Sequence, residues 1–185
     1  TICGMAVIII VVSIVAFITC KGLSTFLVNK VSPFEFLFSP AWDPELPPND
    51  GGPKVGAFVF IYGSLLISSI ALLFSVPMST GTAVFISEIA PKWGRMILQP
   101  VIELFVGIPS VVYGWEGLNV IVPFVRNIFG GYGMSVLAGG IVLSIMMFPT
   151  ITSVMVDSLK AIPPYLNEAS YAMGATRWQT IWNVL

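Results

Sequence analysis

The chain has 185 residues, of which 56% are hydrophobic and only 9% are charged, and its formal net charge is −1. A soluble domain carries about 25% charged residues, so this composition excludes an ordinary soluble protein and indicates an integral membrane protein. The slightly negative charge argues against nucleic acid as a partner. The absence of histidine, with only two cysteines, removes the usual transition-metal ligand sets.

Four apolar blocks are each long enough to cross a bilayer, whose core of about 30 Å takes a helix of about 20 residues. We place the membrane spans near residues 4–28, 56–77, 97–122 and 135–156. We expect the first span to be a retained anchor, because it exceeds the apolar core of a signal peptide and lacks an Ala-x-Ala cleavage pattern. Its two cysteines would lie about 25 Å apart along a helix, too far for a disulfide.

A proline-rich, net acidic segment, residues 29–54, separates the first two spans, and we expect it to form an exposed, irregular loop. Its charged residues are Glu35, Asp43, Glu45 and Asp50 against Lys30 and Lys54.

The second apolar block has no charge from Val55 to Ser87. As a helix it would measure about 50 Å, which overshoots one membrane crossing. We therefore expect the span to end near Pro77 and a separate short helix to run from about Ser79 to Ile89.

Basic residues orient the spans through the positive-inside rule. They flank the connections that follow the second and fourth spans, whereas the 29–54 loop is acidic. We therefore expect the N-terminus, the 92–95 turn and the C-terminal tail to be cytoplasmic, and the 29–54 and 123–134 loops to lie outside. The basic residues concerned are Lys92, Arg95, Lys160 and Arg177.

Two proline-containing segments inside the last two spans, around Pro109 and Pro149, predict interrupted helices whose freed backbone groups need hydrogen-bond partners. Interrupted helices can present N–H groups to an anion, although the nearby hydroxyls can equally bond their own helix. Glu103, an acid within the apolar layer, is either a gate carboxylate or part of a structural pair. The candidate pathway residues are Glu103, Pro109, Ser110, Tyr113, Thr150 and Ser153.

The C-terminal residues predict two short helices joined by a tight turn. Pro163 and Pro164 suit a helix entrance, Gly174 suits a left-handed helix end, and Thr176 to Gln179 has capping-box spacing. We expect the apolar face of the first helix to pack and its polar face to meet solvent or a partner. That apolar face consists of Tyr165, Leu166, Ala169, Ala172 and Met173. The alternative is an amphipathic hairpin that lies on lipid headgroups, which suits Trp178 and Trp182.

Several short segments follow one another in a recognisable order. They are Tyr62-Gly-Ser-Leu-Leu, Val76-Pro-Met-Ser-Thr-Gly81, Glu88-Ile-Ala-Pro91, Glu103, Ile108-Pro-Ser-Val-Val-Tyr-Gly114, Phe148-Pro-Thr-Ile151 and Glu168-Ala-Ser…Gly174-Ala-Thr. With Ser39-Pro-Ala-Trp-Asp-Pro44 in the first loop, this order resembles the PstC-type permeases of bacterial phosphate ABC importers. The last segment resembles the E-A-A loop by which such permeases engage their ATPase subunits, with Ser170 in place of the second alanine.

The resemblance implies an all-α integral membrane protein of the inner (plasma) membrane, a type I-like ABC importer permease with four of six expected spans. Residues 1–55 would form the first transmembrane helix and extracytoplasmic loop. Residues 56–185 would form an incomplete permease core with the ATPase-docking loop at 160–185. The docking residues would be Glu168, Ala169, Gly174, Ala175 and Thr176.

The implied partners are an ATPase dimer that holds ATP-Mg, a second, PstA-like permease, an extracytoplasmic phosphate-binding protein and the lipid bilayer. This chain needs no cofactor and no catalytic residue, and it contains no phosphate-binding Gly-x-x-x-x-Gly-Lys motif. The alternatives are an ABC permease for molybdate, sulfate or an organic solute, and a channel-like membrane subunit.

Overall fold

The computed structural model describes residues 2–27, 31–47, 52 and 54–183. Lys30 and Asp50, which belong to the predicted loop, lie outside this part of the chain. The contacts divide the chain into two units, Thr1–Gly63 and Ser64–Leu185, and each is described by itself.

The first unit begins with a long apolar helix, α1 (Ile2–Leu27), whose described side chains are almost all exposed. A short helix, α2 (Pro33–Phe38), follows, and its first-turn proline has the backbone angle that a helix start needs. Two-residue strands β1 (Trp42–Asp43) and β2 (Lys54–Val55) then pair antiparallel. The expected irregular loop is therefore partly ordered. One reason is the edge-to-face contact of the Trp42 and Phe60 rings, whose centroids lie 5.0 Å apart.

The second long helix, α3 (Phe58–Val84), continues as a π-helical turn, η2 (Phe85–Ile89), without interruption at Pro77. The prediction that Pro77 ends this span was wrong. A proline removes one helical hydrogen bond, but leaving the helix inside lipid would expose several backbone groups that water cannot reach. Losing one hydrogen bond costs less than exposing several backbone groups to lipid, so Phe58–Ile89 forms one apolar helix.

The third predicted span, 97–122, is not one straight helix. Helix α4 (Lys92–Val106) ends at Gly107, and the following helices turn by 89°. At 1.5 Å per residue, the 15 residues of α4 measure about 22 Å, less than a bilayer core. The segment that lies at this angle to α4 consists of α5 (Ser110–Glu116), the π turn η3 (Gly117–Ile121) and α6 (Val122–Phe129).

The break is located where the sequence analysis expected it, at Pro109. Ile108 precedes a proline and therefore disfavours helical backbone, and Pro109 itself is extended, with ψ 139°.

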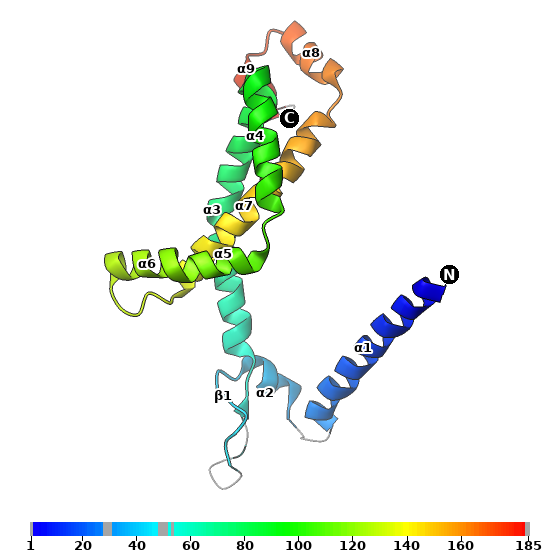
Figure 1. Cartoon of the computed structure of the whole chain (residues 1–185), viewed down its shortest axis with the longest axis vertical. Helices are drawn as coiled ribbons and strands as arrows, with labels where there is room; N and C mark the ends of the chain where they lie inside the picture. Colours follow the sequence, from blue (N-terminus) through cyan, green and yellow to red (C-terminus); the bar gives the residue numbers. More distant parts are fainter. Residues whose placement is uncertain (1, 28–30, 48–51, 53, 184–185) are drawn as a thin grey trace. The chain divides into compact units, whose positions relative to one another are not determined.

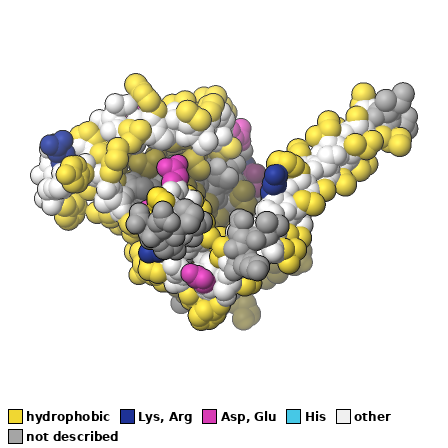
Figure 2. Space-filling view, turned by 90° about the horizontal axis from the view of Figure 1, so that it is seen from below, with side chains coloured by type: hydrophobic (Ala, Val, Ile, Leu, Met, Phe, Trp, Pro, Cys, Tyr) yellow, Lys and Arg dark blue, Asp and Glu magenta, His cyan; other side chains and the backbone are white. Residues whose placement is uncertain are grey.

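The last long helix, α7 (Val136–Lys160), runs through Pro149, so the expected interruption there was wrong. Its 25 residues measure about 37 Å, enough to cross a membrane. Among the described residues, three helices are long and apolar enough to span a bilayer, or four if the bent pair is one span. Apolar side chains accordingly are spread over the parts of the chain seen in Figure 2, with few charged groups between them.

Small residues line the buried face of α3, and at Ser79 this face contacts α7. They recur every four residues and are all buried: Ala71, Ser75, Ser79 and Ala83. The Ser79 hydroxyl donates to the carbonyl oxygen of Phe148 on α7 at 3.1 Å. Thr152, also on α7, donates to the same oxygen at 2.7 Å. These two bonds join α7 to α3 and to its own next turn, whereas the carbonyl that Pro149 leaves without its helical donor is that of Ile145.

An apolar core forms where α3 and its π turn meet α4 and α7, and it contains Ala83, Ile86, Ile102 and Val156. Figure 1 shows these helices side by side, with α5 and α6 crossing beyond the far end of α4. The chain then ends in two short helices, α8 (Pro164–Ala172) and α9 (Arg177–Asn183).

Candidate functional site

The predicted C-terminal helix-turn-helix is confirmed, together with both of its predicted caps. Gly174 has φ +85°, and its N–H donates to Tyr171 O while the Ala175 N–H donates to Ser170 O. This pair of bonds is the Schellman arrangement, which satisfies carbonyl groups at the end of α8. At the start of α9, the Thr176 hydroxyl accepts from Gln179 N and the Gln179 carboxamide oxygen accepts from Thr176 N at 2.8 Å. That reciprocal pair is a capping box.

The hairpin, which we define as α8 and α9 with their turn, closes through polar side chains. The hydroxyl oxygens of Ser170 and Thr180 lie 2.9 Å apart, and Thr180 is only 1% exposed. The expectation that the apolar face of α8 packs was therefore wrong for this part of the chain. Tyr165 is 64% exposed and Met173 is 89% exposed, because the opposite face meets α9. Glu168 and Ala169 are also exposed.

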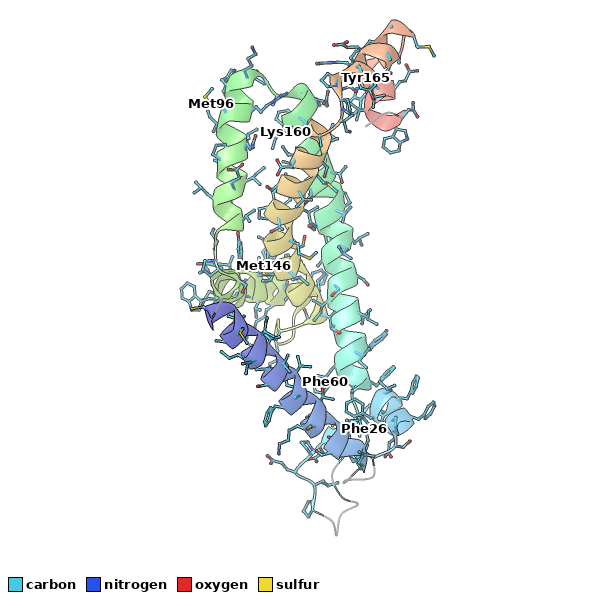
Figure 3. The ribbon with its side chains drawn as sticks, turned by 90° about the vertical axis from the view of Figure 1, so that its right-hand side faces the viewer. Phe26, Phe60, Met96, Met146, Lys160 and Tyr165 are labelled. Atoms are coloured by element: carbon cyan, nitrogen blue, oxygen red, sulfur yellow. The ribbon has the colours of Figure 1, made fainter. Side chains whose placement is uncertain are left out.

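The hairpin lies at the end of the bundle where the basic residues gather. Figure 3 shows Tyr165 of α8 at the same end as Met96 and Lys160. The Lys160 ammonium group donates to the Gln99 carboxamide oxygen at 2.6 Å, which joins the last turn of α7 to α4. Arg177 of α9 donates to the backbone oxygen of Glu88 at 3.3 Å. Basic side chains thus gather beside the hairpin, with Glu88, Asp157 and Glu168 among them, and the sequence analysis derived a cytoplasmic end from these basic residues.

Three of the six candidate pathway residues line one cavity of about 350 Å³ where α4, α5 and α7 meet. They are Ser110, Tyr113 and Thr150, and Met146 of α7, labelled in Figure 3 near the level of α5, is another wall residue. The Tyr113 hydroxyl donates to Phe105 O at 2.8 Å. Phe105 lies in the last turn of α4 and its oxygen also accepts from the Ile108 N–H at 3.2 Å, so the tyrosine adds a second bond that ties α5 to the end of α4. Part of the role of Tyr113 is therefore structural.

The other three candidates lie outside that cavity. Pro109 is the N-cap residue of α5 and directs the chain into the bend. The Glu103 carboxylate accepts from Gln99 Nε2 at 3.0 Å on α4. Ser153 lines a separate space of about 10 Å³ with Gln99 and Asp157.

Gln99 is the residue that the sequence analysis missed. Its carboxamide links the Lys160 ammonium group to the Glu103 carboxylate, so the acid within the apolar layer is connected to a base. The spacing of Gln99 and Glu103, four residues apart, signals a contact on one helix face. The bond to Lys160, 61 residues away, depends on tertiary packing and has no signal in the sequence.

The comparisons with known proteins agree with this architecture. The family described as binding-protein-dependent transport system inner membrane component matches residues 79–185, more than half of the chain. A probable ABC transporter permease protein of Bacillus subtilis, YqgH, is 51% identical over 186 residues. That match covers 100% of this chain and 59% of the relative.

A phosphate transport system permease protein of Xylella fastidiosa, PstC, is 36% identical over 170 residues, which cover 81% of this chain and 51% of that protein. The chain therefore spans about half the length of the curated relatives that it matches. Among solved structures, a chain of the MetNI methionine ABC transporter in inward-facing conformations has 25% identity and a TM-score of 0.52. The structural match covers 70% of this chain and 59% of that one.

The family match extends from the second half of α3 through the hairpin, and it therefore contains both the cavity and the docking candidates. The described helices of membrane-spanning length indicate a multi-pass membrane protein, and the MetNI likeness is to a chain of an ABC transporter. The chain belongs to the binding-protein-dependent transport system inner membrane components, and it is a multi-pass ABC transporter permease subunit rather than an enzyme.

Proposed function

We propose that this chain is the permease subunit of an ABC importer that moves inorganic phosphate into the cell. The observation that supports phosphate as the substrate is the likeness to PstC proteins, at 36% identity over 81% of the chain. The PstC-like order of segments from Tyr62 to Thr176 supports the same substrate. The Bacillus subtilis relative supports the coarser assignment to ABC permeases.

The cavity between α4, α5 and α7 supports a role in the translocation path. Ser110 and Thr150 line it, and within the described part of the chain neither hydroxyl has a hydrogen-bond partner. Both hydroxyls are therefore available to an oxyanion. Phosphate carries a charge of about −1 to −2 at neutral pH, so a path that excludes water must also supply positive potential. None of the cavity's lining residues is basic, and we assign that charge to a second, PstA-like permease.

The hairpin is the proposed site for the ATPase dimer. Its exposed apolar face, which includes Tyr165 and Met173, is an unfilled packing surface on an otherwise well-capped element. An extracytoplasmic phosphate-binding protein would deliver the substrate on the opposite side. ATP and magnesium would be bound by the ATPase chains.

The test is transport by the reconstituted complex. Proteoliposomes that hold this permease, its partner permease and the ATPase should take up labelled phosphate only when the binding protein and ATP are on opposite faces. Uptake of molybdate or sulfate without phosphate would refute the substrate and leave the ABC-permease assignment intact.

Variants of the cavity sharpen this test. Ser110→Ala and Thr150→Val remove the two free hydroxyls and should lower the phosphate uptake rate. Ser153→Ala, outside the cavity on the same helix as Thr150, is the matched control and should transport normally. Equal rates for all three variants would refute the role of the cavity.

A further inference from the structure

The turn between α3 and α4 contains two backbone carbonyls that the helix cannot satisfy. In a regular helix the Ser87 oxygen would accept from the N–H of residue 91, but that residue is Pro91 and has no N–H. The Glu88 oxygen would accept from residue 92, but the chain has turned away. Ala90 and Pro91 are both extended, with ψ 136° and 160°.

Two arginine side chains supply the missing donors. Arg95, one turn further along α4, donates to the Ser87 oxygen at 2.5 Å. Arg177 of α9 donates to the Glu88 oxygen at 3.3 Å, across 89 residues of sequence. A cation at the C-terminal end of α3 is also favourable to its helix dipole. The first donor belongs to the turn's own helix, whereas the second belongs to the hairpin.

The same turn is anchored in the bundle on its other side. Ile86 in the π turn is fully buried and packs in one apolar core with Ile102 of α4 and Val156 of α7. Because packed cores move as units rather than deform continuously, a displacement of the turn must be shared with α4 and α7. These two helices also line the cavity that contains Ser110 and Thr150.

We propose that Arg177 is a positioning residue that transmits displacement of the hairpin to the α3–α4 turn. Its hydrogen bond to the Glu88 oxygen ties the surface that meets the ATPase to the helices that line the cavity. Arg177 touches neither substrate nor nucleotide in this scheme. The inference rests on the proposed function, since it assigns a route by which the ATPase acts on the permease.

The experiment uses the whole transport complex in proteoliposomes and measures phosphate taken up per ATP hydrolysed. Arg177→Ala should still assemble with the ATPase, but its coupling ratio should fall about tenfold, as expected for a lost hydrogen bond from a charged donor. Arg177→Lys keeps a cationic donor and should restore part of the ratio. Arg126→Ala, an arginine at the end of α6, is the control and should couple normally.

A distance measurement separates transmission from a merely structural role. Spin labels at Trp93→Cys on α4 and Trp182→Cys on α9, in a protein whose two native cysteines are replaced, report the separation of the two elements, and both positions are exposed. With Arg177 present, the separation should stay constant when ATP is added, because the elements move together. With Arg177→Ala, it should change.

The possible outcomes test the role of Arg177 separately from the proposed transport function on which it rests. Normal coupling in Arg177→Ala, equal uncoupling in Arg177→Ala and Arg177→Lys, or an ATP-independent distance in Arg177→Ala would overturn the role of Arg177 while leaving the transporter assignment intact. If the unmodified chain binds no ATPase, the proposed function and this inference both fail.

Discussion

The contact between α3 and α7 leads to a stability prediction that compares two adjacent glycines. A Cβ atom added at Gly140 would lie 2.5 Å from Ile70 Cγ2 and 2.8 Å from Ile70 Cβ. A Cβ atom added at Gly139 would lie 3.6 Å from its nearest neighbour, Ile67 Cδ1, which is ordinary van der Waals contact. Gly140→Ala should therefore force the helices apart, and Gly139→Ala should not.

The expected magnitude follows from overpacking. Inserting a methyl group into a filled core costs about 1–3 kcal/mol. Both substitutions gain the same helix propensity, about 1 kcal/mol for alanine over glycine, so this gain cancels in the comparison. We expect Gly140→Ala to be about 1–3 kcal/mol less stable than Gly139→Ala.

The assay is reversible unfolding of the two purified variants in mixed detergent micelles, followed by circular dichroism. A double variant, Gly140→Ala with Ile70→Ala, removes the closest clashing atom and should recover part of the loss. Equal stability of Gly140→Ala and Gly139→Ala would refute the close helix contact on which this reasoning depends.

Three further predictions concern the cap, the interhelical hydrogen bond and the topology. Gly174→Val should cost about 1–2 kcal/mol in its left-handed backbone and weaken ATPase co-purification, whereas Gly174→Asn, which tolerates that backbone, should bind normally; normal binding by the valine variant would contradict this. Ser79→Ala loses a hydrogen bond between helices and should lower the free energy of unfolding by about 0.6 kcal/mol. Ser75→Ala, one turn away, removes a buried hydroxyl that has no partner and should leave the free energy of unfolding unchanged. A larger loss in Ser75→Ala than in Ser79→Ala would contradict the hydrogen-bond assignment. In a variant without native cysteines, an impermeant thiol reagent should label Glu45→Cys but not Met173→Cys from outside intact cells; labelling of the second would overturn the orientation.

Features that depend on local geometry were predictable from the sequence. The Thr176 to Gln179 spacing and Gly174 predicted the caps of the hairpin, because each cap involves residues within a few positions of one another. The position of the bend at Pro109 was predictable for the same reason. Composition was sufficient for the membrane class, because no soluble fold can bury so apolar a chain.

Features that depend on the surroundings were not predictable. A proline locally favours a helix end, yet α3 runs through Pro77 and α7 runs through Pro149, since the outcome depends on what the surrounding helices and lipid offer the freed backbone groups. The periodicity of α8 shows which residues share a face, but it does not show which face α9 covers. That choice depends on the Ser170–Thr180 contact, between residues ten positions apart on different helices.

The short α4 changes the depth at which a polar solute would meet protein. A helix of about 22 Å stops about 8 Å before the far edge of a 30 Å apolar layer, and the crossing α5 and α6 occupy the remaining depth. In a membrane whose near edge coincides with the start of α4, the backbone groups at the end of α4 and the start of α5 would lie about 8 Å inside the far edge. Because these groups are polar, the bent backbone shortens the apolar distance that an anion would have to cross from that side.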